Sequence, residues 1–235
     1  QGAITTGHRG RAEVEIVLRG LAGHASAPER AKNSLDLVPA VLKALQELAG
    51  SQPRDPVLGP ATLVPTGVEA RPESRNVVPD EAVVVVDWRV LPGKDDDELL
   101  GMVEEVIRRH LPEIPEGMGV EVRMAREHQA AYTGRAEIRD LYTPAFLMDA
   151  ADPIVLAAAD AVGRRDGSGP AVVRPWTFAT DGGWSHGVFG IPTLGFAPGE
   201  ERFAHTNRER LDVEEARWAY ERHPALILAV QKVVE

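Results

Sequence analysis

The sequence predicts a mixed α/β protein in which a ferredoxin-like domain precedes part of an α/β domain. Four segments between residues 10 and 127 alternate polar and apolar residues, as half-buried strands do, and two segments with helical spacing separate them. The order β-α-β-β-α-β is that of the ferredoxin-like unit, a two-layer fold. Beyond residue 150, helix-like and strand-like segments alternate. We therefore expect domains at 10–127 and 150–235, joined by an irregular connector at 128–149.

Local signals support each element of the first domain. Pro39 falls in the first turn of a helix, where its missing N–H is harmless, and Gly50 is a favourable residue just after the helix end. Pro65 favours an edge position for its strand. In the second helix, acidic residues at the N-terminus and basic residues at the C-terminus suit the helix dipole. The expected strands are 10–20, 61–70, 81–91 and 119–127, and the expected helices are 34–50 and 94–111.

The second part is less regular. We expect helices at 152–165 and 212–234, the latter kinked by Pro224, and strands at 171–179 and 191–199. The Gly-rich stretch at 180–190 separates the two strands and has room for a short helix. These strands are too few to close a sheet of their own.

Composition excludes several classes of partner. The 235 residues carry a formal net charge of −10, which argues against a nucleic acid or an anionic membrane surface as partner. Without cysteine, disulfides and thiolate metal sites are impossible. No apolar run is long enough to span a membrane, and we expect a cytoplasmic protein.

Five short stretches stand out by their order along the chain. They are GHAS at 23–26, SRNVVP at 74–79, DWR at 87–89, TDGG at 180–183 and GIPTLGFAPGEERFAHTNRE at 190–209. The ordered set resembles the di-zinc amidohydrolases that include acetylornithine deacetylase, succinyl-diaminopimelate desuccinylase, aminoacylase and glutamate carboxypeptidase. The resemblance implies that residues 10–127 form a lid domain that pairs in a homodimer. Residues 150–235 would then be the last third of a catalytic domain.

The chain also departs from this family. The family's catalytic domain opens with an H-x-D stretch, a bridging Asp and a Glu-Glu pair, which supply most ligands of the two zinc ions and the general base. No H-x-D occurs here, and the Glu-Glu pairs at 104–105, 200–201 and 214–215 are misplaced for that role. We therefore expect that the remaining ligands lie outside these residues and that the chain alone is inactive. The resemblance implies zinc as the metal, with cobalt or manganese as possible substitutes.

Two histidines carry the expected chemistry. By resemblance, His205 in FAHTNRE is the last zinc ligand, a role that suits a neutral imidazole beside the small Ala204. His24 in GHAS would reach the partner's active site and donate to the oxyanion of the tetrahedral intermediate. The alternatives are a surface histidine before a helix for His205 and, for His24, a loop histidine bonded to Ser26.

Other residues are expected to contact substrate. Asn76 and Arg89 would hold a carboxylate-bearing amide or peptide, since an amide can bond a carbonyl and a guanidinium can clamp a carboxylate. Spacing alone equally allows an ion pair between Arg89 and Asp87 on one strand face, and a turn role for Asn76.

The glycine-rich stretches complete the expected site. Thr180, Gly182 and Gly199 would place backbone close to substrate, and Asp181 would orient a metal ligand from behind. For each of these residues a tight turn is the plainer alternative.

Two other functions remain open. GWSHG at 183–187 matches the G-x-S-x-G nucleophile elbow, so Ser185 could attack as in a serine hydrolase. An elbow needs a strand running directly into it and a long helix after it, and neither is expected here. Alternatively, the chain is a non-catalytic ferredoxin-like module for dimerisation or ligand binding.

Overall fold

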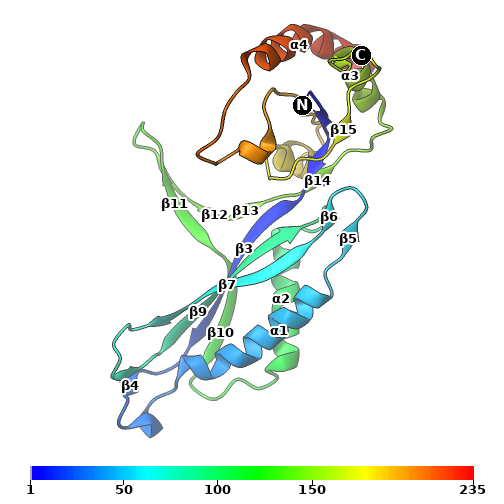
Figure 1. Cartoon of the computed structure of the whole chain (residues 1–235). Coiled ribbons are helices and arrows are strands. Elements are labelled where there is room, and N and C mark those ends of the chain that lie inside the picture. Colours follow the sequence, from blue (N-terminus) through cyan, green and yellow to red (C-terminus); the bar gives the residue numbers. More distant parts are fainter. Residues whose placement is uncertain (1) are drawn as a thin grey trace. The chain divides into compact units, whose positions relative to one another are not determined.

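The computed structural model describes residues 2–235, which form two compact units (Figure 1). The lid unit comprises Arg11–Asp55 and Gly59–Tyr142. The C-terminal unit comprises the residues up to Gly10, Pro56–Leu58 and Thr143–Glu235. The lid unit thus continues past residue 127, where the sequence suggested a boundary.

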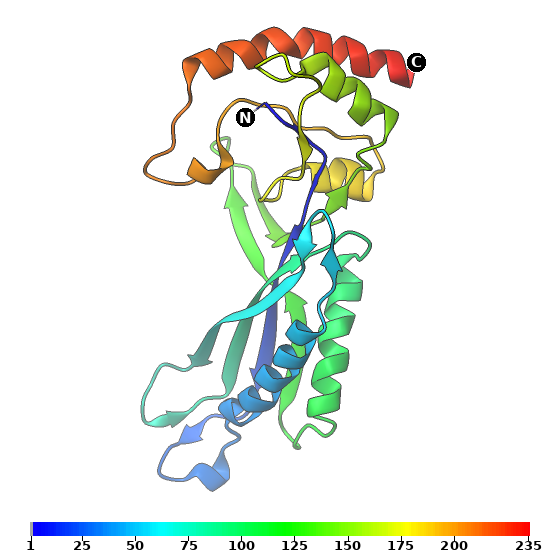
Figure 2. The same cartoon turned by 45° about the vertical axis from the view of Figure 1, so that its right-hand side comes forward.

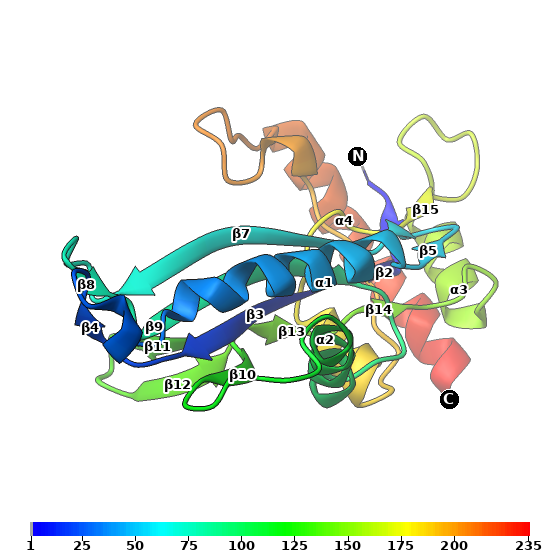
Figure 3. The same cartoon turned by 90° about the horizontal axis from the view of Figure 1, so that it is seen from below.

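The lid unit is built on an antiparallel sheet of the predicted ferredoxin-like order. Its strands are β3 (Gly10–Arg19), β7 (Thr62–Arg71), β9 (Glu81–Val90) and β10 (Gly119–Met124). The spatial order is β10-β3-β9-β7, with β13 (Tyr142–Thr143) also pairing with β3. Figure 3 shows β7 at one edge of this sheet. Pro65 lies in this edge strand, beside an irregularity in its pairing with β9, as its missing N–H requires.

Two helices cover one face of the sheet. They are α1 (Val38–Gly50), which follows the 3₁₀ turn η2 (Ser34–Leu37), and α2 (Asp96–His110). The helices pack against each other and lie side by side on the sheet (Figure 2). Alternate residues of β3 and β9 meet them in the core, which includes Val14, Ile16, Val84, Val86, Trp88, Val41, Leu45, Leu99 and Val103. The alternation predicted from the sequence therefore sets which face is buried.

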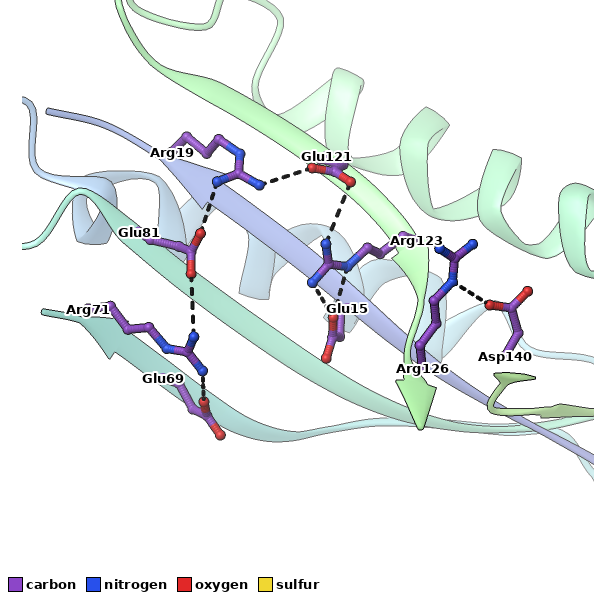
Figure 4. A network of polar contacts seen from close by, with 9 residues as sticks. All are labelled: Glu15, Arg19, Glu69, Arg71, Glu81, Glu121, Arg123, Arg126 and Asp140. Carbon is purple, nitrogen blue, oxygen red and sulfur yellow. Dashed lines mark hydrogen bonds and ion pairs between the residues drawn. The ribbon is translucent and has the colours of Figure 1, made fainter. Parts of the chain in front are cut away.

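Charged side chains cover the opposite face of the sheet in an ion-pair ladder, shown in Figure 4. Arg123 on β10 pairs with Glu15 on β3 at 2.8 Å. Arg19 on β3 pairs with Glu81 on β9 at 2.9 Å. Val17, which points to this same face, is only 1% exposed, as expected where long arginine stems lie over apolar groups. The ion-paired side chains therefore help to shield from solvent the sheet face that α1 and α2 do not cover.

Short elements flank the lid sheet. At one end, β4 (Gly23–His24) pairs with β8 (Val77–Val78), next to the 3₁₀ turn η1 (Pro28–Arg30). Elsewhere β5 (Arg54–Asp55) pairs with β6 (Gly59–Pro60). An additional hairpin joins β11 (Arg126–Ala130) to β12 (Ala136–Asp140). The expectation of an irregular connector from residue 128 is wrong here. The hairpin exposes both faces, so it carries no apolar alternation to reveal it.

The C-terminal unit is centred on the first residues of the chain. β1 (Ile4–Thr5) pairs in parallel with β15 (Val173–Arg174), and β2 (Gly7–His8) pairs antiparallel with β14 (Phe146–Leu147). The helices α3 (Pro153–Val162) and α4 (Val213–Val234) pack together, with Ile4 and Ala158 in the core between helix and strand. α4 continues through Pro224 without interruption.

Two expected strands of this unit are shorter than predicted. Of the segment 171–179 only β15 forms, and 191–199 makes only an isolated bridge, Gly195 to Thr5. The Trp176 ring packs directly against Gly195. A Cβ on residue 195 would lie 1.9 Å from this ring, so only glycine fits at this position. The short π-helical turn η3 (Gly183–Val188) and the 3₁₀ turn η4 (Glu201–Phe203) connect the remaining loops. Among residues 2–235, no helix has the length and apolarity to cross a membrane.

Candidate functional site

The fold brings His24 and Asn76 together at one end of the lid unit. β4 and β8 pair so that His24 faces Val77, and the N–H of Ala25 donates to the carbonyl of Asn76 at 2.9 Å. Both predicted residues are exposed. Two stretches about fifty residues apart in sequence therefore share one small surface, which we call the lid tip.

Local hydrogen bonds fix the tautomer of His24. The backbone N–H of Ser26 donates to Nδ1 of His24 at 3.2 Å, and the Ser26 hydroxyl lies 2.7 Å from the same nitrogen. Because an amide N–H can only donate, Nδ1 must be the unprotonated acceptor. The hydrogen of the neutral ring is then on Nε2. His24 thus presents an N–H donor from an exposed loop, the group that an oxyanion requires. The expected alternative, a contact with Ser26, is present and is compatible with this role.

Asn76 is oriented by a neighbour within its own turn. The Ser74 hydroxyl donates to Oδ1 of Asn76 at 2.7 Å. With its oxygen occupied, the side chain has its NH₂ group to offer a ligand, which suits a carbonyl or carboxylate oxygen.

Arg89 does not share the lid tip within one protomer. It faces Thr62 near the end of β9, eight residues beyond Glu81, a separation of roughly 26 Å at about 3.3 Å per residue. Its guanidinium binds Asp87 at 2.8 and 3.2 Å, and Arg11 binds the same carboxylate at 3.0 Å. The ion pair weighed as the alternative is thus formed. The role of Arg89 toward a substrate stays a prediction.

The TDGG segment lies in the C-terminal unit and enters η3. Oγ1 of Thr180 accepts from the N–H of Gly182 at 3.2 Å, and the carbonyl of Asp181 accepts from Trp184 and Ser185. The side chain of Asp181 is exposed. Thr180 and Asp181 therefore present a turn whose backbone is already well bonded.

Close packing explains the two glycines of this segment. A Cβ on Gly182 would lie 2.5 Å from the Phe146 ring, and one on Gly183 would lie 2.0 Å from the carbonyl oxygen of Pro144. Both contacts are with the protein's own interior. The structure thus favours a packing role for Gly182, and its approach to a substrate stays a prediction.

His205 has an unusual backbone. Its φ of 61° is the one positive value at a non-glycine position among residues 2–235. Its N–H donates to Glu209 at 3.0 Å, and a hydrogen-bonded turn at Thr206 follows it. A histidine in the left-handed region is uncommon, and such strain gathers at functional sites. The side chain is exposed. This geometry is consistent with a ligand held outward by its turn.

A pocket of about 460 Å³ adjoins this turn within the C-terminal unit. Gly199, whose φ of 106° favours glycine, lines it. Arg174 in the pocket wall pairs with Glu201 at 2.8 Å, and the second carboxylate oxygen of Glu201 is buried with no hydrogen-bond partner among residues 2–235. Trp176 and Phe178 add aromatic surface. The pocket therefore combines apolar walls with a paired arginine, as small-molecule sites commonly do.

The described residues do not assemble a zinc centre by themselves. Among residues 2–235, no three or more His, Asp or Glu side chains converge in a way that could hold a metal ion. A structural or catalytic zinc needs about three protein ligands. His205 alone does not meet that requirement, and in the described part of the chain it belongs to no cluster of possible ligands, with Asp181 or otherwise.

Ser185 is not set up as a nucleophile. Its Oγ lies 2.7 Å from the Thr193 hydroxyl, and Nδ1 of the adjacent His186 faces the carbonyl of Ile191. β15 ends nine residues before η3, so no strand runs directly into the turn. Within the described part of the chain, Ser185 Oγ therefore bonds neither a histidine nor a carboxylate, and no strand–turn–helix elbow surrounds it.

Sequence reasoning anticipated the contact between Ser26 and His24 but missed two residues of these sites. Arg174 had no signal in its strand. No motif marked His8, yet its ring bonds the TDGG segment, because the N–H of Thr180 donates to its Nε2 at 3.0 Å. Only the fold brings these two residues together.

The sequence of the chain is similar to those of several known proteins. Residues 6–115 match the family model described as the peptidase dimerisation domain. The chain is 33% identical to the uncharacterized protein YgeY of Escherichia coli K12 over 207 residues, which are 88% of this chain and 50% of that protein. It is 26% identical to acetylornithine deacetylase of Myxococcus xanthus over 212 residues, again 88% and 50%. The chain spans about half the length of these curated relatives.

The fold of the whole chain has been seen before. The structure of aminopeptidase PepT from Bacillus cereus superposes on this chain with a TM-score of 0.66 and 22% sequence identity. The superposition covers 98% of this chain and 54% of the PepT chain. Residues 6–115 are thus similar to the dimerisation domain of M20 peptidases, and the chain as a whole is similar to proteins that are named as an amide hydrolase and as a peptidase. The family resemblance predicted from the sequence is confirmed.

Proposed function

We propose that this polypeptide forms part of a hydrolase of amide bonds that acts on peptides or N-acyl amino acids. The observation that carries the proposal is the lid tip, where His24 has a fixed tautomer and an outward N–H beside Asn76. A relative that is named acetylornithine deacetylase supports the reaction class.

The residues of the lid tip would act on the scissile amide. Nε2–H of His24 would donate to the oxygen that becomes negative in the tetrahedral intermediate, and the Asn76 amide would bind the same carbonyl or a nearby carboxylate. His24 ends the short strand β4 and Asn76 lies in a turn, and both are exposed, so they are free to meet a site on a second protomer. No proton transfer is assigned to His24, because donation alone suffices for this role.

The same proposal includes metal dependence, inferred from the family. His205 would be one ligand, with zinc as the expected metal and cobalt or manganese as substitutes. Since the described residues do not complete a metal site, the other ligands would come from elsewhere, and residues 1–235 alone would not hydrolyse amides.

We further propose that the protein works as a homodimer through the lid unit. The edge strand β7 leaves one side of its backbone unpaired, and it exposes Val64 and Val68 by 52% and 47%. Edge strands with exposed apolar residues pair readily with a second strand. A second copy of β7 is the partner of matching length.

The direct test is an assay of the product of the complete gene. N-acetyl and N-succinyl amino acids and dipeptides are offered, and the released amine is measured with and without a chelator. We expect chelator-sensitive hydrolysis, restored by zinc or cobalt. His24→Ala should lower kcat by about 10² to 10³, the usual effect of losing one oxyanion donor, with a smaller change in KM.

Two outcomes would favour the alternatives. Hydrolysis that resists chelators, together with fluorophosphonate labelling of Ser185, would favour a serine hydrolase. No hydrolysis of any amide, together with a stable dimer, would favour a non-catalytic module for dimerisation or ligand binding.

A further inference from the structure

His8 is a fully buried histidine with a partner on each ring nitrogen. It ends β2 and has 0% exposure. Nδ1 lies 3.0 Å from the carbonyl oxygen of Arg9. Nε2 lies 3.0 Å from the backbone nitrogen of Thr180, across 172 residues of sequence. The Phe146 ring stands edge-on at 4.9 Å, and the Trp176 ring lies at 6.4 Å. The ring is therefore confined by packing as well as by bonds.

The two partners define one protonation state. A carbonyl can only accept, so Nδ1 must carry hydrogen, and an amide N–H can only donate, so Nε2 must be bare. Both bonds coexist in the neutral ring alone. A proton on Nε2 would turn this nitrogen toward the Thr180 carbonyl, which lies 3.1 Å away, and would leave the Thr180 N–H without its acceptor.

The segment that His8 holds is tightly confined. A Cβ on Gly183 would come within 3.4 Å of His8 Cε1, and its nearest contact would be the carbonyl of Pro144 at 2.0 Å. Gly182 packs against Phe146, the same ring that faces His8. Packing against residues 144–146 therefore fixes the position of Gly182 and Gly183, and the hydrogen bond to His8 fixes the position of Thr180.

We propose that His8 is a positioning residue, which holds the Thr180–Gly183 segment in place through a neutral imidazole with hydrogen on Nδ1. No metal or substrate contact is assigned to it. The bond restrains Thr180, and through the turn it restrains the outward side chain of Asp181. That this restraint matters for catalysis rests on the proposed function. The hydrogen bond itself is independent of that function.

The test is NMR spectroscopy of the ¹⁵N-labelled chain at neutral pH. Long-range ¹H–¹⁵N correlations identify which nitrogen of each histidine carries hydrogen. We expect Nδ1 of His8 to be protonated and Nε2 to be bare, and the Thr180 amide to exchange slowly with solvent. Titration to lower pH should change the Thr180 amide signal together with the His8 ring signals.

Two variants and a control separate the bond from the fold. In His8→Gln, the side-chain oxygen can accept from the Thr180 N–H, whereas in His8→Leu no acceptor remains. We expect Thr180 amide exchange to rise about tenfold or more in His8→Leu, as the loss of one buried hydrogen bond implies, and to rise less in His8→Gln. His128→Leu, which changes an exposed histidine of the lid unit, should leave the Thr180 amide unchanged.

The outcomes are distinct. Hydrogen on Nε2 of His8 at neutral pH would overturn the inference, and this measurement needs no variant to fold. Equal Thr180 exchange in wild type and a folded His8→Leu would overturn it as well. If the Thr180 amide responds as expected but the complete enzyme hydrolyses no amide, the inference stands and the proposed function fails.

Discussion

At the scale of single residues, burial decides how His8 responds to pH. Desolvation lowers the pKa of His8 below 6.5, although the hydrogen bonds that a charged ring could donate to the carbonyl oxygens of Arg9 and Thr180 act in the opposite direction. Burial removes water from around the charged form, and the hydrogen-bond partners of the ring among residues 2–235 are backbone groups rather than carboxylates. The folded protein therefore favours the neutral imidazole more than the unfolded chain does.

This shift predicts a loss of stability in mild acid. Between the folded pKa and 6.5, the unfolded chain binds more protons than the fold, so the free energy of unfolding rises with pH across this window. The contribution is fully present above 6.5 and decreases as pH falls, with a slope of at most about 1.4 kcal/mol per pH unit. Urea denaturation from pH 7.5 to 5 should show this slope in wild type and a smaller one in His8→Gln. Equal slopes would contradict the prediction.

A second prediction at this scale concerns Gly183. Its alanine variant places a Cβ against the Pro144 carbonyl, and neither backbone can move freely. We expect a loss of about 1–3 kcal/mol in stability, as overpacking usually causes. Gly101→Ala is the matched control. It lies in α2 with open space around it and should stabilise the helix by up to about 1 kcal/mol. Thermal denaturation of both variants checks the opposite signs.

At the scale of elements, the start of α2 shows how local sequence produces structure. The Asp95 side chain accepts from the N–H of Glu98 at 2.9 Å, and the Glu98 side chain accepts from the N–H of Asp95 at 3.0 Å. This capping box satisfies two donors that the helix leaves free. Two further acidic residues in the first turn, Asp96 and Asp97, suit the positive end of the helix dipole.

Removal of the cap should cost more than removal of a neighbouring charge. Asp95→Ala leaves the Glu98 N–H without its acceptor, and we expect a loss of about 1 kcal/mol. Asp97→Ala removes the same charge from the same turn but no cap, so its loss should be smaller. Urea unfolding followed by circular dichroism measures both. Equal losses would mean that the charge rather than the cap matters.

Sequence predicted the elements of the lid unit because each buries one face. The alternation in β3 and β9 gave their faces, and Pro65 gave the edge strand. Prediction from the sequence failed for the β11–β12 hairpin, whose residues are exposed to solvent on both sides. It failed also for the expected strand at 191–199, where only Gly195 forms a bridge. Among site residues, His24 and Asn76 carried local signals. The bond between His8 and Thr180 joins residues far apart in sequence, so only the three-dimensional fold reveals it.

At the scale of the whole molecule, the proposed dimer gives the final prediction. Val64 and Val68 lie on β7, whose outer side has no neighbouring strand among residues 2–235. Lysine at both positions would bring like charges together in a symmetric pair of strands, which opposes edge-to-edge association. Light scattering should report a dimer for the wild type and a monomer for Val64→Lys/Val68→Lys. Lysine at Ile138, which is 68% exposed on β12, should leave the dimer intact. A wild-type monomer at micromolar concentration would contradict the proposal.

The ion pairs on the charged face of the lid sheet restrict which substitutions this surface can accept during evolution. Each rung in Figure 4 sets a guanidinium against a carboxylate, as Arg123 does with Glu15. Arg123 also lies 3.8 Å from Glu121, so a reversal at Arg123 would place it beside two like charges, and a swap with Glu15 alone would still leave two carboxylates together. Tolerated variation on this face should therefore change several linked positions at once, with solitary reversals selected against.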